Sequence, residues 1–82
     1  MLIGTLFGEL VELESRTEPG WRLKYLSQTG LIQIFQVAEN LYVIRFTCNE
    51  HMQLITSPGL TFVDSDNRLC ILTRNTYYIF KI

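Results

Sequence analysis

Short runs of β-branched and aromatic residues alternate along this chain with clusters of turn-forming residues. Such clusters stand at Glu18-Pro19-Gly20, at Ser57-Pro58-Gly59 and at residues 64–67. Turn signals at intervals of about eight to twelve residues are typical of an all-β sandwich or barrel. The predicted strands are residues 2–7, 9–14, 21–27, 31–37, 41–48, 52–56, 60–63, 68–73 and 76–82.

One segment fits two structures. In residues 5–16 apolar residues recur at spacings of three and four with glutamates between them, which fits an amphipathic helix capped by Thr5. The segment also fits a strand in which Val11 and Leu13 point inward. The nearby glycines and the following turn favour the strand. We therefore predict a small antiparallel meander that closes into a barrel or sandwich, with at most one short N-terminal helix.

Strict alternation indicates which side chains share a core. Successive side chains of a strand point to opposite faces, so every second residue lines the same side. The sets predicted to face inward are Trp21, Leu23 and Tyr25; Tyr42, Ile44, Phe46 and Cys48; and Tyr78, Phe80 and Ile82.

Two predicted strands are apolar on both faces. Leu31 and Phe35 lie opposite Ile32 and Ile34 in one strand, and Tyr77 and Ile79 lie opposite Tyr78 and Phe80 in another. A half-solvated sheet shows polar residues on its outer face, so these strands predict a second covering layer. We predict that a second copy supplies it, in a homodimer with Tyr77, Ile79, Leu31 and Phe35 at the interface. Alternatively, residues 5–16 of the same chain cover this face of the C-terminal strand.

Length and composition limit the remaining possibilities. The 82 residues make one domain, residues 1–82, because two domains would each be too small for a stable core. With 48% hydrophobic and 18% charged residues the chain is not disordered. No apolar run approaches the roughly 20 residues that span a bilayer, so no membrane partner is expected.

The cysteines and the first residues bear on the expected location. Cys48 and Cys70 each lie in an apolar stretch, which indicates two buried free thiols rather than a disulfide framework. The first residues lack the basic segment of a signal peptide, and glycines interrupt their apolar run. The expected location is the cytoplasm.

Candidate chemistry is sparse. The single histidine, His51, stands beside Glu50 in a predicted turn, without the nucleophile that a catalytic imidazole needs. The pair Glu12 and Glu14 has the same-face spacing of a cation or acid–base site, and so has the pair Asp64 and Asp66. The first pair equally fits a solvated strand face and the second a hairpin turn. We expect no catalytic residue, no metal site and no cofactor, and therefore no enzyme.

Charge argues against nucleic acid as the main partner. The net charge is −1, and the six cations after residue 20 are scattered. In residues 21–25 alternation sends aromatic and basic side chains to opposite faces, whereas a nucleic-acid platform needs them together.

The last third of the chain resembles a family of small uncharacterised bacterial and phage proteins. These end in a Thr-Ser-hydrophobic strand, a turn and a Thr-x-Asn-Ser/Thr-x-Tyr strand, which Thr56, Ser57, Thr73, Asn75, Thr76 and Tyr78 match here. The resemblance covers about 25 residues and departs from the pattern at Gly59, where the family tends to have an aliphatic residue. It implies a C-terminal β-hairpin and a phage or mobile-element context, and it assigns no activity.

These observations favour a non-enzymatic protein-binding or adaptor module that self-associates and has an unknown protein partner. Two alternatives remain open: a phage or mobile-element inhibitor of a host protein, and a nucleic-acid-binding small β-barrel. An apolar surface patch with an acidic rim would favour the binding module or the host-protein inhibitor. A basic groove would favour the nucleic-acid-binding barrel.

Overall fold

The computed structural model describes residues 1–16 and 20–82, which form one antiparallel sheet of seven strands and a single short helix. In chain order the elements are β1 (Leu2–Ser15), the 3₁₀ helix η1 (Gly20–Tyr25), β2 (Thr29–Ala38), β3 (Leu41–Asn49), β4 (Met52–Ile55), β5 (Gly59–Val63), β6 (Arg68–Thr73) and β7 (Thr76–Lys81). The all-β prediction is confirmed.

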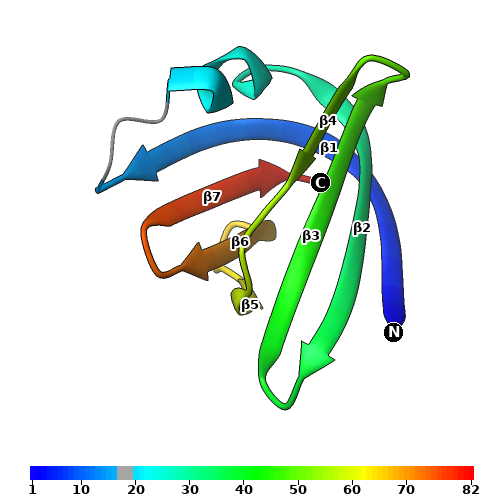
Figure 1. Cartoon of the computed structure of the whole chain (residues 1–82), viewed down its shortest axis with the longest axis vertical. Coiled ribbons are helices and arrows are strands. Elements are labelled where there is room, and N and C mark those ends of the chain that lie inside the picture. Colours follow the sequence, from blue (N-terminus) through cyan, green and yellow to red (C-terminus); the bar gives the residue numbers. More distant parts are fainter. Residues whose placement is uncertain (17–19) are drawn as a thin grey trace.

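The sheet closes on itself because β1 is shared. Its first half pairs with β2, from Leu2 to Glu9, and its second half pairs with β7, from Glu9 to Ser15. The remaining neighbours run β7–β6–β5–β3–β2, so the hydrogen bonds form a ring, with β4 as a further neighbour of β3. Figure 1 shows β1 curving round the molecule from one half of the ring to the other.

The ring turns two corners, and a glycine marks each. At Gly8, where β1 changes partners, a side chain would meet the carbonyl oxygen of Lys81. At the second corner the chain leaves β4 at Thr56, whose hydroxyl accepts the N–H of Ile44 in β3 at 3.0 Å, and enters β5 at Gly59. A side chain on Gly59 would meet the carbonyl oxygen of Leu72. Both residues are glycine because two backbones pass too closely for a Cβ atom.

Both halves of the ring contribute to one core. Its members are Leu10, Tyr25, Ile32, Ile44, Phe46, Leu54, Leu69, Ile71, Tyr78 and Phe80. Phe46 from β3 and Phe80 from β7 meet edge to face with ring centroids 5.1 Å apart, so aromatic packing joins the two halves.

Most predicted strands and turns are confirmed. Residues 5–15 belong to a strand, and Gly8 lies inside that strand rather than ending it, because it serves as the corner. Asn40 and Asn67 take positive φ angles of 58° and 60° in two of the predicted turns, as asparagine tolerates. Two residues of the turn predicted at 18–20 lie outside the described residues.

The strand predicted at 21–27 is wrong. This segment is the 3₁₀ helix η1 and a following turn, so Trp21, Leu23 and Tyr25 do not share a buried face. Only Tyr25 enters the core, whereas Trp21 and Leu23 are 54% and 51% exposed. β2 starts beside Glu9, whereas β1 continues to Ser15. At about 3.3 Å per strand residue, the end of β1 is roughly 20 Å from the start of β2. The helix η1 and the turn after it lie in this connection, and the alternation of residue types does not predict them.

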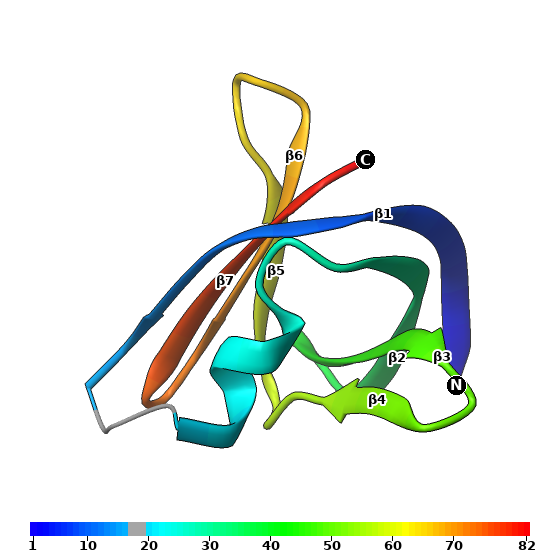
Figure 2. The same ribbon diagram turned by 90° about the horizontal axis from the view of Figure 1, so that it is seen from above.

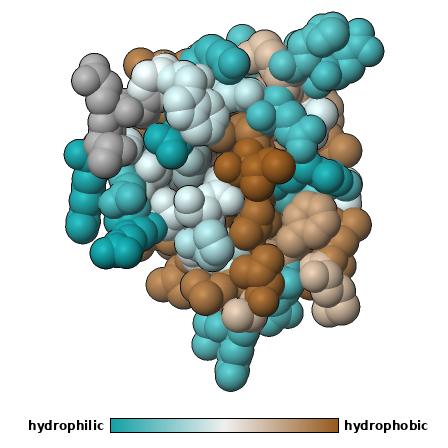
Figure 3. Space-filling view, in the orientation of Figure 1, coloured by the Kyte–Doolittle hydropathy of each residue, from teal (hydrophilic) through white to brown (hydrophobic). Residues whose placement is uncertain are grey.

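Many large apolar side chains remain exposed outside the buried core. Figure 3 shows hydrophobic residues gathered through the middle of one face, with hydrophilic residues on both sides. In other proteins, extended apolar patches of this kind are commonly interaction sites.

We predict that Gly59→Ala destabilises the protein by about 1–3 kcal/mol, because the new methyl group forces apart β5 and β6. Gly4→Ala is the matched control, since its Cβ meets only the Ile34 Cδ1 atom, at 3.9 Å. Urea unfolding followed by circular dichroism measures both. Equal stability of the two variants would contradict the assigned role of the second corner.

Candidate functional site

The outward side of β5, β6, β7 and the second half of β1 carries an apolar surface, which we call the outer face. The strand registers align its residues in two rows across four strands. The first row is Leu60, Leu72, Tyr77 and Glu14, and the second is Phe62, Cys70, Ile79 and Glu12. Apolar side chains on β5–β7 are thus bordered on β1 by two carboxylates.

The outer face has a packed layer of its own. The rings of Phe62 and Tyr77 lie nearly parallel, with an interplanar angle of 20° and centroids 6.4 Å apart. Cys70 is fully buried and Ile79 is 5% exposed, although both lie on the side turned away from the core. The pKa of the Tyr77 hydroxyl is raised, first by its interaction with the nearby Cys70 thiol and then by burial. Phe62 is the cross-strand neighbour of Cys70, and the Cys70 thiol also lies 3.9 Å from Asp64 Oδ2 in the β5–β6 turn.

Three large side chains of this face remain open to solvent. Leu60, Phe62 and Leu72 are 52%, 45% and 48% exposed. A side chain held on a hydrogen-bonded strand loses little further freedom when a partner covers it, so such residues suit binding.

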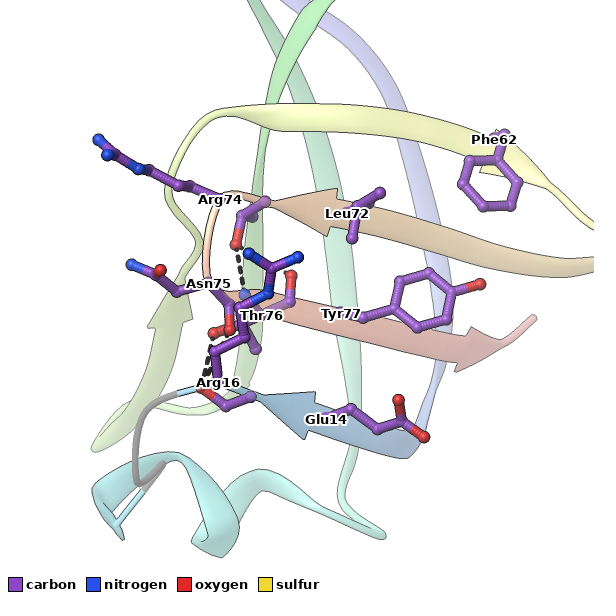
Figure 4. A pocket seen from close by; sticks show the side chains of 10 residues that line it. Glu14, Arg16, Phe62, Leu72, Arg74, Asn75, Thr76 and Tyr77 are labelled. Carbon is purple, nitrogen blue, oxygen red and sulfur yellow. Dashed lines mark hydrogen bonds between the residues drawn. The ribbon is translucent and has the colours of Figure 1, made fainter.

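A groove of about 510 Å³ runs from Phe62 and Tyr77 past Leu72 to the β6–β7 turn. Figure 4 shows Arg16 and Arg74 near the turn, with Phe62, Tyr77 and Glu14 towards the other end. Among the described residues no carboxylate forms an ion pair with either arginine. The groove thus joins an apolar floor to a cationic end.

Hydrogen bonds hold the cationic end in place. The Thr73 hydroxyl donates to the carbonyl of Thr76 at 2.9 Å and accepts the N–H of Thr76 at 3.1 Å, which closes the hairpin turn. The N–H of Arg16 donates to the carbonyl of Asn75 at 2.8 Å, so the end of β1 is tied to the same turn. β6 and β7 form a C-terminal β-hairpin, the element implied by the resemblance to small bacterial and phage proteins.

A charged cluster borders the opposite side. Asp64 Oδ1 accepts the N–H groups of Asp66 and Arg68 at 2.9 and 3.0 Å, and Oδ2 accepts from Arg68 Nε at 2.9 Å. Arg68 Nη1 also lies 3.7 Å from Glu12 Oε1. The hydrogen bond from the backbone of Arg68 is the main cause that lowers the pKa of Asp64.

The four residues predicted for a dimer interface fall on two surfaces. Tyr77 and Ile79 belong to the outer face, but Ile79 is buried within the chain and offers a partner little area. Leu31 and Phe35 point outward from β2 in the other half of the ring. The guanidinium of Arg45 lies 5.2 Å from the centre of the Phe35 ring. A single flat contact does not contain all four residues.

The other candidate residues form no reaction centre. His51 is exposed in the β3–β4 turn, with its Nε2 atom 3.3 Å from Glu50 Oε1. The Asp64 carboxylate is occupied by the turn it organises, and Glu12 and Glu14 face solvent. Among the described residues no group of three or more His, Cys, Asp or Glu side chains is placed to hold a metal ion.

Sequence reasoning missed Phe62, Leu72 and Leu60 as surface residues. A signal was present, because residues 68–73 are apolar on both faces just as residues 76–82 are. Two adjacent strands with this pattern indicate a covered or binding face, but the sequence does not show that they are neighbours.

No family model, curated protein or solved structure matches this chain. In the described part of the chain no helix has the length and apolar character needed to cross a membrane.

We predict that Phe62→Ala speeds the labelling of Cys70 by a thiol reagent without unfolding the protein, since it removes the large side chain directly opposite Cys70. Cys48 is the internal control, because it lies on β3 and burial raises its pKa independently of this face. Peptide mass spectrometry after timed labelling separates the two thiols. Unchanged labelling of Cys70 would show that Phe62 does not protect it.

We predict that Asp64 stabilises the fold above about pH 4 and that this contribution is lost as the pH falls. The pKa of Asp64 is lowered in the folded protein, so its protonation favours unfolding. The stability difference between the wild type and Asp64→Asn, from urea midpoints, should shrink between pH 7 and pH 3. A difference that stays constant over this range would contradict the assignment.

Proposed function

We propose that this protein is a non-enzymatic binding module whose outer face holds an extended apolar segment of a partner protein. The observation that carries the proposal is the exposure of Leu60, Phe62 and Leu72 on strands that are already hydrogen-bonded and packed beneath. Binding interfaces place large apolar anchors at their centre and polar groups at their rim. The outer face has this arrangement.

Charge indicates what the partner carries beside its apolar residues. Arg16 and Arg74 at one end of the groove have no acidic partner among the described residues, while Glu12 and Glu14 border the β1 side. A partner segment with two or three apolar side chains and a carboxylate near one end would meet both the floor and the arginines.

Nucleic acid is the competing ligand class. Phe62 and Tyr77 share the groove with two arginines, which is the combination that single strands stack on. Glu12 and Glu14 on the same face repel phosphates, and the net charge of −1 supplies no general attraction. These charges favour a protein segment.

We also propose that the module acts in the cytoplasm. Both cysteines are free, and unpaired thiols are typical of a reducing compartment.

A random-peptide display library selected against the immobilised protein tests the proposal. We expect enriched peptides with alternating apolar residues and an acidic residue near one end. Leu72→Asp should weaken the best peptide at least about tenfold in a fluorescence polarisation assay, because it places a charge in the centre of the face. Leu72 is exposed, so this variant should retain its fold.

Leu23→Asp is the control, since Leu23 is 51% exposed on η1, outside the outer face. Failure to enrich any peptide, or equal binding by the two variants, would overturn the proposal. A labelled oligothymidylate that binds at micromolar concentration with a steep salt dependence would assign the groove to nucleic acid instead.

A further inference from the structure

Among the described residues, the ring has two places where strand edges have no strand neighbour, and η1 with the turn after it covers one of them. The second half of β1 and β4 are bridged by η1 and the turn after it. Tyr25 donates its hydroxyl to the carbonyl of Gln53 at 2.7 Å, and the N–H of Leu10 donates to the carbonyl of Gln28 at 3.1 Å. Figure 2 shows η1 on the opposite side of the ring from the N-terminal bend of β1.

The other place lies between the first half of β1 and β5. Residues 2–8 of β1 pair only with β2 on one side, and β5 beyond Gly59 pairs only with β6, among the residues that the structure describes. In an edge strand every second N–H and C=O points away from the sheet and is free to bond another strand. This edge of β1, over Leu2–Gly8, we call the open edge.

Apolar residues are exposed at the open edge. Leu6 and Val63 lie on the inward side, in register with the buried residues Ile32 and Leu69, yet they are 37% and 57% exposed. Phe7 is 68% exposed on the outward side. The core is therefore left partly uncovered where the ring lacks a further strand.

The open edge has one of the usual protections against pairing, a bulge between Leu2 and Gly4, and lacks the others. Edge strands are commonly blunted by charged residues, especially lysine, or by proline. Residues 1–8 include neither a charged side chain nor a proline. A second copy of this segment would meet no like charge, whereas residues 9–14 of the same strand carry three glutamates.

We propose that two copies of this chain join by antiparallel pairing of their open edges, with a two-fold axis close to Thr5. Each copy then supplies the strand that the other lacks, and every contact forms twice, as in an isologous interface. Thr5 faces Thr5 of the second copy, a favourable cross-strand pair, and Leu6 faces the second copy's Gly4. The strands β4, β3, β2 and β1 of both copies form one continuous sheet.

This interface lies apart from the outer face, so the inference does not rest on the proposed function. The outer face uses β5, β6, β7 and the second half of β1, beyond the open edge. A dimer would present two outer faces at once, and a partner with two binding segments would be held more tightly than by one copy.

Disulfide trapping tests the geometry. Directly opposed residues of antiparallel strands have Cα atoms about 4.5–5.5 Å apart, which suits a disulfide. We expect Thr5→Cys to form a cross-linked dimer in high yield with oxidised glutathione, and Glu50→Cys, exposed in the β3–β4 turn, to remain largely uncross-linked. Equal cross-linking of both variants, or none at Thr5→Cys, would overturn the proposed pairing.

Sedimentation equilibrium tests the association itself. The wild type should be dimeric at roughly 100 μM, and Thr5→Lys, which places like charges opposite each other, should be monomeric with an unchanged circular dichroism spectrum. Thr5→Val should remain dimeric. A monomeric wild type, or a Thr5→Lys dimer, would refute the proposal. The outer-face variant Leu72→Asp should stay dimeric, so failure of the proposed function is distinguishable from failure of this one.

Discussion

The passage of β1 from one half of the ring to the other is the constraint on which the rest of the structure depends. At Gly8 the strand stops pairing with β2 and begins to pair with β7, so close to the carbonyl of Lys81 that no side chain fits. Bulges on either side, between Leu2 and Gly4 and between Leu10 and Glu12, accompany the curvature of the strand. Because one strand serves both halves, Phe46 and Phe80 can meet in a single core.

The same closure explains why so much apolar surface stays outside. A chain of 82 residues buries only about 60% of the surface it exposes when unfolded. Its strands fill a narrow interior with one set of side chains, and no other element of the described residues forms a layer over the opposite set on β5, β6 and β7. Cys70 and Ile79 are nevertheless buried, and the groups near Cys70 include Phe62 opposite it on β5 and the Asp64 carboxylate in the β5–β6 turn. The large side chains around them remain available for contact.

The sequence predicts most of the architecture and little of the site. Turn residues such as Asn40 and Asn67 and the alternation of Ile44 and Phe46 follow local rules, so the strands of the second half of the chain are predicted well. The helix η1 is missed because Arg22 and Lys24 alternate with apolar residues as they would in a strand. The outer face depends on which strands are neighbours, and this is set by long-range pairing. Strands with apolar residues on both sides predict a second apolar face besides the core. Only the pairing of β6 with β7 shows that these residues lie together on one face.

Native-state hydrogen exchange measures most directly whether the shared strand couples the two halves of the ring. The account predicts that the amides of Ile32 in β2 and Phe80 in β7 exchange with the same free energy of opening. It also predicts that Gly8→Ala lowers both by the same amount. If the substitution removes protection from one half while the other keeps its wild-type value, the halves are stable independently and β1 does not hold the fold together.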